Sequence, residues 1–479
     1  MSSHGKNTAL RVLLDEAEMS NSGLANAVVA SGAREGIHLG TGTTSVKRML
    51  DGSQPRWPVP RLVATVLSRR LRRQVSVTEC GFADRTPAEQ DPHDGLNSSG
   101  TLEGTVRTVV ELSGQDMRRR KFLLGSVFSA AAFTEPALLA LTVPPAEGTA
   151  RAAGRRVGKA EVEILTEQVS HLRQLDCHYG SGRVREQVVS LLHREANQLL
   201  HASYSDKTGK TLLTAVAQAT NLAGHTAADM GRHSLAQRYY IQALDLAMRA
   251  GDRLYAANML SYMSRMTLLI GQNALTDHDT HNRYGRQAAA LARTGLAVTQ
   301  GTTAPVLAAE LHALEGRGLA LLGDVRAARH AVLQAERLYE SPRSGDEPPW
   351  LGFFTAATFA ADLGRGLRAI GEPEQAITLS TKALYGYEPW RVRDRCFVQT
   401  DLASAHLLDR DMEQAAALGR DALRTAAEVS SHRLLDRLRT LQRQVRPLRS
   451  ATPHLADLDD RITDFLAHTT RRQNEDRDL

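Results

Sequence analysis

The chain has 479 residues, of which 42% are hydrophobic and 5% aromatic, and its formal net charge is +6. This length provides apolar material for two or three folded domains, and an Ala-, Leu- and Arg-rich composition with few aromatics favours helix over sheet. The three cysteines lie far apart and form no CxxC pair, which argues against a disulfide framework and a cysteine zinc site. A reducing cytoplasm is the expected location.

The net charge is concentrated near the N-terminus. Residues 1–85 hold 12 Lys or Arg against 7 Asp or Glu, a net charge of +5, so the other 394 residues carry about +1. An excess confined to one short segment predicts a small basic domain, residues 1–85, attached to a large and nearly neutral body.

The N-terminal domain has the pattern of a compact helical bundle. Residues 6–18 place leucines on one helical stripe, and Ser20 can cap a second helix that Gly32 and Gly36 are expected to end. A third helix precedes the turn at GSQPRWP, and a fourth, RLVATVLSRRLRR, begins after Pro58.

The third helix, which Gly52 ends, divides into an apolar and a polar face. Val46, Met49 and Leu50 fall at i, i+3 and i+4, so they face the core and leave small hydroxyls and cations toward solvent. In a DNA major groove, about 12 Å wide, small hydroxyls approach base edges while cations reach guanine or phosphates. A solvated basic face without function is the alternative. The candidate DNA-binding residues on this helix are Thr43, Thr44, Lys47 and Arg48.

The surrounding segment adds further positive charge. Between Arg34 and Arg73 there are nine Lys or Arg and two acidic residues, a net charge of +7. Such a surface neutralises phosphates and provides salt-dependent affinity that is largely independent of base sequence. Arg56, beyond Gly52, is expected near the DNA backbone.

The N-terminal domain also resembles a known family over residues 6–83. It is similar to the helix-turn-helix of phage-repressor-like regulators, in the variant found in large actinomycete regulators of differentiation and antibiotic production. The similar segments are SNSGLANAVV, TTSVKRMLDGSQPRWP and PRLVATVLSRRLRRQVSVTECGF. The resemblance implies that the second and third helices form the DNA-reading pair, and it favours repression of development and secondary metabolism. It places five residues toward the groove: Thr43, Thr44, Ser45, Lys47 and Arg48.

A linker and an apolar segment follow. Residues 86–100 contain Pro, Gly and small polar residues without apolar periodicity, which predicts a flexible linker. In the helical connector at 101–158, the segment RRRKFLLGSVFSAAAF imitates a twin-arginine export signal. It lies more than a hundred residues from the N-terminus, and its uncharged run is shorter than the roughly 20 residues of a membrane span. We therefore expect a buried packing helix and no membrane association.

Residues 159–468 contain a self-similar helical pattern, followed by a polar tail at 469–479. Gly231, Gly323 and Gly371 each have an alanine five and twelve residues later and a glycine seven residues earlier. Small residues are needed where paired helices cross closely, and glycine suits the turn between the helices of a pair. The pattern is similar to the tetratricopeptide repeat, so the whole chain is predicted to be all-α, with a helix-turn-helix bundle and a tetratricopeptide-like superhelix.

Two less regular copies extend the repeat. Arg410 continues the register in place of glycine. Gly271 fits if an insertion near residues 272–283 separates its helices, with Ala290 and Ala297 as the later pair of small residues.

In tetratricopeptide repeats the first helix of each pair lines the concave face, so the resemblance implies a groove. Two asparagine side chains, one histidine and three arginines recur on these first helices at related positions. They could bind a peptide backbone, carboxylates or another anion. The alternative is a solvent-exposed helical face on which the arginines form ion pairs with neighbouring acidic residues. The candidate groove residues are Asn221, His225, Asn258, Arg265, Arg317 and Arg365.

Catalytic and metal-binding motifs are absent from the sequence. It contains no GxGxxG, GxSxG, HExxH or EF-hand loop, and its histidines lack ligand spacing. The pattern HxxxxDCH at residues 171–178 is the nearest to a catalytic group, and we expect it on the surface at a helix end. Neither an enzyme, a metal nor a cofactor is predicted.

The sequence thus predicts a cytoplasmic, nucleoid-associated transcription regulator. A homodimer would bind double-stranded DNA at half-sites about 34 Å apart. The repeat domain would mediate self-association and bind a peptide, protein or small-molecule effector. The alternative is a helical-repeat adaptor that does not bind DNA.

Overall fold

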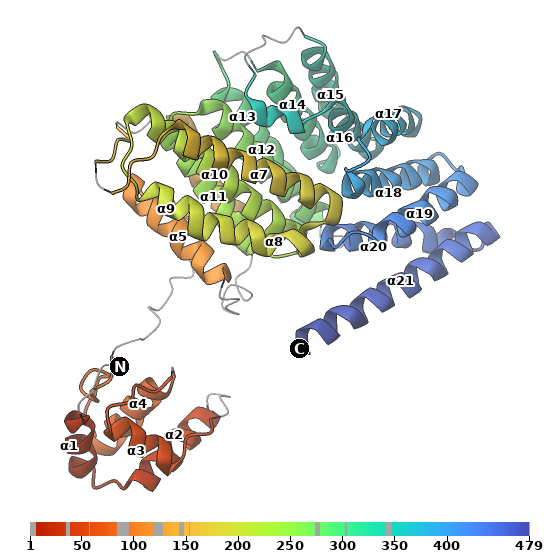
Figure 1. The fold of residues 1–479 in the computed structure, drawn as a ribbon. Helices are drawn as coiled ribbons and strands as arrows, with labels where there is room; N and C mark the ends of the chain where they lie inside the picture. Colours follow the sequence, from red (N-terminus) through yellow and green to blue (C-terminus); the bar gives the residue numbers. More distant parts are fainter. Residues whose placement is uncertain are drawn as a thin grey trace. The chain divides into compact units, whose positions relative to one another are not determined.

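The computed structural model of the protein describes residues 6–34, 39–56, 58–83, 95–117, 128–142, 148–152, 154–273, 278–301, 304–341 and 347–478. Within these ranges the regular secondary structure is helical, and the only β-type pairings are two isolated bridges. The predicted all-α fold is therefore confirmed. The chain forms two compact units, Met1–Pro92 and His93–Leu479, both drawn in Figure 1.

The N-terminal unit is a bundle of four helices around one apolar core. The Ser20 hydroxyl accepts a hydrogen bond from the Gly23 amide at the start of the second helix, as the sequence predicts. All four helices contribute to the core, for example through Leu10, Val28 and Leu62, which are fully buried. The helices are α1 (Thr8–Glu16), α2 (Asn21–Arg34), α3 (Thr43–Leu50) and α4 (Val59–Leu71).

The second helix passes through Gly32 and ends at Arg34, between the two glycines that were expected to end it. A glycine inside a helix costs only about 1 kcal/mol relative to alanine. Ser31 beside it is buried, so this turn is held by packing against the bundle. Gly36 lies outside the described residues. The predicted end of the third helix at Gly52 is confirmed, since α3 stops at Leu50 and Gly52 adopts a positive φ of 95°.

The C-terminal unit is a succession of helix pairs preceded, in the described part of the chain, by five other α-helices (Figure 1). The leading helices are α5 (Leu102–Met117), α6 (Thr134–Thr142), α7 (Lys159–Tyr179), α8 (Ser181–Ser190) and α9 (Asn197–Leu200). The pairs are α10 (Asp206–Asp229) with α11 (His233–Ala250), α12 (Arg253–Asn273) with α13 (His278–Val298), α14 (Pro305–Leu321) with α15 (Val325–Tyr339), α16 (Ala356–Ala369) with α17 (Pro373–Gly386), α18 (Val392–Leu408) with α19 (Met412–Ala426), and α20 (His432–Val445) with α21 (Pro453–Asp478). Short helical turns include η2 (Ala130–Phe133) and η4 (Pro349–Phe353).

Four turns between paired helices follow the predicted register. Gly231, Gly323 and Gly371 have φ values of 73°, 77° and 84°, and Arg410 adopts the same left-handed conformation with φ of 65°. Glycine enters this conformation without a steric penalty, whereas arginine is uncommon there. The alanines five and twelve residues after these anchors are at most 1% exposed; they are Ala236, Ala243, Ala328, Ala335, Ala376, Ala383, Ala415 and Ala422.

The glycine seven residues before the anchor lies where the helices of a pair touch. A Cβ atom at Gly364 would lie 2.5 Å from the Ser380 hydroxyl and 3.2 Å from the Ala376 carbonyl oxygen. A Cβ atom at Gly316 would lie 3.2 Å from the Ala328 carbonyl oxygen. The small residues therefore set how closely the paired helices approach.

The repeat placed on Gly271 is correct as a helix pair but wrong in its register. Gly271 lies within α12 and not at a turn, and α13 begins inside the predicted insertion. The Ser264 hydroxyl of α12 donates to the Ala288 carbonyl oxygen at 2.9 Å, which corresponds to the contact between Gly364 and Ala376. The second helix is thus shifted by two residues: Ala288 is fully buried, while the predicted Ala290 is exposed and Ala297 is half-buried.

The predicted flexible linker is shorter on its C-terminal side. Within residues 86–100, the described part from Gly95 onward packs against α11. The Gln242 side-chain amide donates to the Gly95 carbonyl oxygen at 3.0 Å, and the Ser98 hydroxyl donates to Asp245 Oδ1 at 2.9 Å. A backbone carbonyl and a serine hydroxyl of the predicted linker thus form hydrogen bonds with α11.

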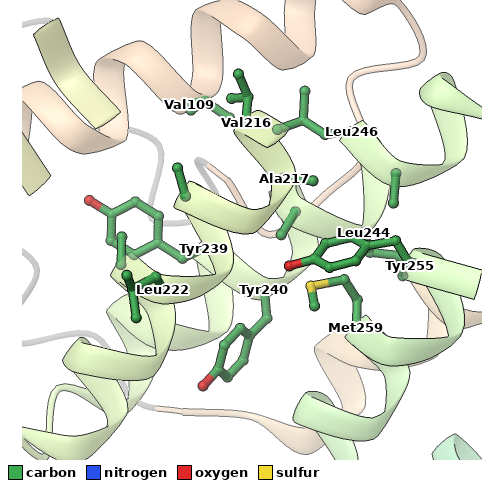
Figure 2. Packing of buried hydrophobic residues seen from close by; sticks show 14 of the residues in the cluster. Val109, Val216, Ala217, Leu222, Tyr239, Tyr240, Leu244, Leu246, Tyr255 and Met259 are labelled. Atoms are coloured by element: carbon green, nitrogen blue, oxygen red, sulfur yellow. The ribbon is translucent and has the colours of Figure 1, made fainter. Parts of the chain in front are cut away.

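The predicted connector belongs to the same core as the repeats. Figure 2 shows Val109 of α5 near Val216 of α10 and Leu246 of α11, and all three are at most 1% exposed. In the apolar segment at 118–133, the first ten residues lie outside the described part, and Phe133 of η2 is fully buried in this core. The predicted polar tail at 469–479 is a continuation of α21, which extends to Asp478.

The helical array of the C-terminal unit closes on itself. The Ser430 amide, in the turn before α20, donates to the Tyr179 carbonyl oxygen at 2.9 Å, and the Ser430 carbonyl oxygen accepts from the Gly182 amide at 3.0 Å. Arg393 of α18 forms an ion pair with Asp176 of α7 at 2.8 Å. Helices α7 and α8 are thereby joined to α18 and to the turn before α20, across more than 200 residues of sequence. Among the described helices, none combines the length and the hydropathy needed to cross a lipid bilayer.

Candidate functional site

The N-terminal unit presents the polar face of α3 to solvent. Val46, Met49 and Leu50 are 0%, 3% and 5% exposed, so the predicted apolar face is confirmed. On the opposite face lie side chains that are exposed and make no hydrogen bond or ion pair with any other described residue. They are Thr43, Thr44, Lys47 and Arg48.

Ser45 differs from its neighbours on α3. It is half-buried, and its hydroxyl accepts a hydrogen bond from the Gly42 amide at 3.4 Å, which closes the first turn of the helix. This contact occupies the side chain that the resemblance placed toward a groove. Arg56 is exposed in the segment between α3 and α4.

Part of the predicted basic surface is neutralised by acids outside the counted segment. Arg73 forms ion pairs with Glu16 of α1 at 3.1 Å and with Glu79 at 3.0 Å. The Arg70 guanidinium donates to the Ala17 carbonyl oxygen at 3.2 Å. Arg73, just beyond α4, therefore contributes less positive charge than the sequence count indicates, whereas Lys47 and Arg48 of α3 have no acidic partner among the described residues.

The C-terminal unit contains a cavity of about 290 Å³ on the concave side of its helix pairs. The walls come mainly from the first helices α10, α12, α14, α16 and α18, together with α7 and α20. This is the face that the repeat pattern predicts for a groove.

Five of the six candidate groove residues line this cavity. Asn221 is the exception, because it is fully buried and its side-chain amide donates to the Tyr255 hydroxyl at 3.3 Å. The predicted stripe is otherwise brought together as His225, Asn258, Arg265, Arg317 and Arg365.

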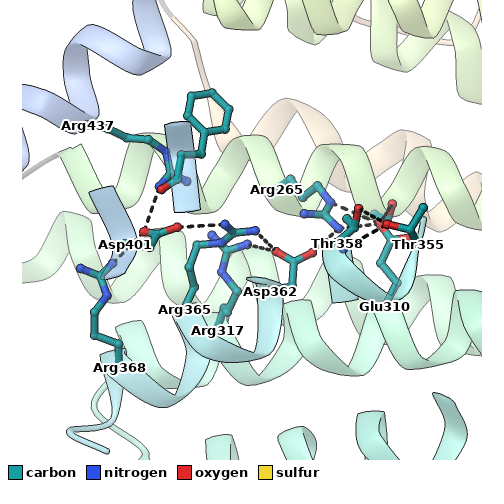
Figure 3. A network of polar contacts seen from close by, with 12 residues as sticks. Arg265, Glu310, Arg317, Thr355, Thr358, Asp362, Arg365, Arg368, Asp401 and Arg437 are labelled. Atoms are coloured by element: carbon teal, nitrogen blue, oxygen red, sulfur yellow. Dashed lines mark hydrogen bonds and ion pairs between the residues drawn. The ribbon is translucent and has the colours of Figure 1, made fainter. Parts of the chain in front are cut away.

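Asp362 of α16 is the centre of the polar network on the cavity wall (Figure 3). Its carboxylate is 0% exposed and accepts from Arg265 at 2.6 Å, from Arg317 at 3.1 Å and from Arg365 at 2.6 Å. Burial alone would raise the pKa of this carboxyl, but the three guanidinium groups hold the pKa of Asp362 well below its ordinary value. Helices from three different pairs are thus joined through one anion.

Two further acids extend the network. Glu310 of α14 accepts from Arg265 at 2.9 Å, and burial raises the pKa of the Glu310 carboxyl. Asp401 of α18 accepts from Arg365 at 3.0 Å and from Arg437 at 2.9 Å. The arginines of the stripe therefore pair with neighbouring acids, as the alternative interpretation expected, although their setting is buried and not a solvent-exposed helical face.

The HxxxxDCH pattern does not lie on the surface as expected. Asp176 is fully buried and Cys177 is 5% exposed, since the closure of the array covers the end of α7. Asp176 Oδ2 lies 2.8 Å from Arg393 and 3.3 Å from His225 Nε2. Burial lowers the pKa of His225, and Asp176 opposes this change. His171 alone of these four residues is exposed.

One wall of the cavity comes from an insertion that the sequence interpretation missed. The turn η4 lies between α15 and α16, and the Trp350 and Tyr255 rings meet edge to face with centroids 5.1 Å apart. The Arg173 guanidinium lies 5.3 Å from the centre of the Phe353 ring. Two signals were available: the aromatic run PPWLGFF in an aromatic-poor chain, and the 48 residues between Gly323 and Gly371, more than the usual 34 of a tetratricopeptide repeat.

Further cations reach the cavity from helices outside the predicted stripe. Arg173 lies on α7, Arg393 on α18, and Arg433 and Arg437 on α20. Arg393 also pairs with Asp176 of α7, so the two ends of this set of helices meet at the cavity. The linear sequence carries no signal for this closure.

The comparisons with known proteins concern the N-terminal unit. Residues 10–83 match the family model described as SP15 N-terminal domain, a range that corresponds to the folded N-terminal unit. A search of the curated proteins found no match.

Proposed function

We propose that the protein is a DNA-binding transcription regulator that contacts double-stranded DNA through α3 and receives a regulatory ligand in its C-terminal unit. The observation that supports this most directly is the face of α3. There, Thr44, Lys47 and Arg48 are exposed and make no hydrogen bond or ion pair with any other described residue, while the opposite face anchors the helix in the core. A major groove accepts a helix with this distribution of side chains.

The first turn of α3 suits close approach to DNA. Gly42 and Thr43 are small, and a Cβ atom at Gly42 would meet no other atom within 4 Å. Lys47 lies one turn further along the same exposed face, and Arg56 follows the helix in an exposed segment. Threonines at the leading end would read base edges, and the cations would contact guanine or phosphates.

We further propose that the protein acts as a homodimer. A single helix-turn-helix commonly gains affinity by pairing, with half-sites about 34 Å apart. The resemblance to actinomycete regulators favours repression of genes for development and secondary metabolism. Self-association is assigned to the C-terminal unit, the larger of the two.

The test is a mobility-shift assay with the purified full-length chain, genomic fragments and a salt titration. The triple variant Thr44→Ala, Lys47→Ala and Arg48→Ala is expected to lose at least about tenfold in affinity for the preferred fragment. Loss of one phosphate contact should reduce the salt slope by about 1. Arg11→Ala is the matched control, because Arg11 is an exposed arginine on α1.

The opposite result would favour the adaptor. Binding without sequence preference at every salt concentration, or unchanged affinity in the triple variant, would contradict the role proposed for α3.

A further inference from the structure

The cavity of the C-terminal unit holds more cations than the acids around it can neutralise. Eight arginines line it, and six carboxylates lie within 4.0 Å of them. The arginines are Arg173, Arg265, Arg317, Arg365, Arg391, Arg393, Arg433 and Arg437. The acids are Asp176, Asp229, Glu310, Asp362, Asp394 and Asp401. Buried cations without counter-charge are costly, so an anion would be stabilised here.

Two of these arginines lack a close acidic partner. Arg173 makes its one side-chain hydrogen bond within the described structure to the Tyr262 hydroxyl, at 2.7 Å. The carboxylate oxygen nearest to Arg433 belongs to Asp229 and lies 3.9 Å away, beyond hydrogen-bonding distance. The Tyr262 ring that Arg173 contacts lies 5.8 Å from the Tyr240 ring, measured between centroids, and the Arg433 guanidinium lies 4.8 Å from the centre of the Phe397 ring. Both arginines line the cavity.

Unused donors on two other arginines support the same conclusion. The Nε atoms of Arg317 and Arg393 are buried and have no hydrogen-bond partner in the described part of the chain. The side chains of these arginines are 8% and 3% exposed, and both line the cavity. Burial, together with Arg365 and Arg265, lowers the pKa of Arg317 to about 9, although Asp362 opposes this change. A buried guanidinium with a lowered pKa is a cation that its acidic neighbours compensate only in part.

The other part of the cavity wall is aromatic and apolar. Trp350, Phe353 and Phe354 from the insertion line it, together with Tyr255 and Met266 of α12. Flat apolar groups are favoured between such side chains, because burial removes their surface from water and ring edges can meet ring faces.

The insertion also limits the size of a ligand. An extended peptide in a helical-repeat groove runs along the concave side, but here η4 occupies that side and is fastened to it. Arg391 donates to the Phe353 carbonyl oxygen at 3.2 Å and to the Thr355 hydroxyl at 3.3 Å. The remaining space of about 290 Å³ matches the lower end of small-molecule sites.

We propose that this cavity binds a small organic anion that combines a carboxylate or phosphate with a flat apolar part. The acid would be held between Arg173 and Arg433, and the apolar part would contact Trp350 and its aromatic neighbours. That this anion is the effector of a DNA-binding regulator rests on the proposed function, whereas its binding rests on the cavity alone.

The test is calorimetric titration of the full-length chain with matched probes. Naphthoate and naphthyl phosphate carry the acid and a flat apolar part, naphthalenemethanol lacks the acid, and acetate and inorganic phosphate lack the rings. At least one aromatic acid is expected to bind about tenfold or more tightly than the alcohol, since charge-assisted hydrogen bonds are the stronger class. The acid that binds more tightly identifies a carboxylate or a phosphate as the preferred group.

Variants then place the probe in the cavity. The double variant Arg173→Gln and Arg433→Gln should lose about tenfold or more in affinity for the acid but retain its affinity for the alcohol. Trp350→Ala should weaken both, and Arg173→Lys should recover part of the acid binding. Arg183→Gln, at an exposed arginine of α8 outside the cavity, is the matched control. Circular dichroism of each variant confirms that it is folded.

Three results would overturn the inference. They are equal affinity for acid and alcohol, no binding of either aromatic acid at about 1 mM, and full acid affinity in the folded double variant. The mobility-shift assay on the same preparations separates the two proposals. Ligand binding without DNA binding contradicts the proposed function alone, and DNA binding without ligand binding contradicts this inference alone.

Discussion

The cations of the two units lie in opposite environments. On α3 of the N-terminal unit, Lys47 and Arg48 are exposed and have no acidic partner in the described structure. In the C-terminal unit, Arg265, Arg317 and Arg365 are largely buried and converge on Asp362. Charge in the first region is available to a partner, whereas most of the charge in the second joins helices to one another. A regularly spaced cation thus acquires its role from the acids that the tertiary structure brings to it.

The largest effect is expected when the shared acid of the C-terminal unit is removed. Asp362→Asn leaves three buried guanidinium groups without their common carboxylate, and breaking a buried pair in this way typically costs about 3–5 kcal/mol. The free energy of unfolding of the C-terminal unit, measured in urea by circular dichroism, should fall by about this amount.

A matched control is Asp409→Asn, because Asp409 is exposed after α18. It should change the same free energy by less than about 0.5 kcal/mol. If Asp362→Asn is no more destabilising than this control, the buried network does not hold the helices together, and the contrast between the two regions fails.

Acidification should affect the C-terminal unit through the same network. Burial raises the pKa of Asp401, but Arg437 and the arginines of α16 outweigh this effect and lower it to about 2. Because the pKa is lower in the folded than in the unfolded state, where it is about 3.9, ionised Asp401 stabilises the fold above about pH 4. This contribution, about 2 kcal/mol, should be lost as the pH falls from about 4 to about 2.

The measurement is the urea midpoint of unfolding as a function of pH for the original chain and for Asp401→Asn. The variant should be less stable near neutral pH and should lose less stability over that acidic interval. Parallel pH profiles for the two chains would show that Asp401 does not carry this dependence.

The smallest effect on stability is expected in the N-terminal unit. Lys47→Ala and Arg48→Ala remove exposed cations without an acidic partner, and alanine is a good helix former, so stability should change by less than about 0.5 kcal/mol. Thermal unfolding of each variant, with the buried Leu50→Ala as the destabilising comparison, measures this effect. A large loss of stability in either surface variant would assign these cations to the fold and remove the contrast with the C-terminal unit.

Local sequence patterns predicted much of the architecture. The spacing of Val46, Met49 and Leu50 identified the buried face of α3, and the anchors Gly231 and Gly323 identified turns of the repeat. These features depend on neighbours within one helix or one helix pair, where helical periodicity and glycine conformation suffice. The register at Gly271 was wrong because the length of the connection, and not the pattern of alanines, sets how α13 meets α12.

The sequence by itself therefore determined the all-α class and the apolar faces of the helices, and it predicted six groove positions, of which all but Asn221 line the cavity. Only the tertiary structure decided which acids neutralise those positions and which cations join them. Asp362 lies 45 residues from Arg317 and 97 from Arg265, and Arg433 reaches the cavity because the ends of the array meet near Tyr179 and Ser430. The physical reason is the sequence separation over which each effect acts. Helical periodicity relates residues a few positions apart, whereas the balance of buried charge depends on contacts between helices that are far apart in the chain.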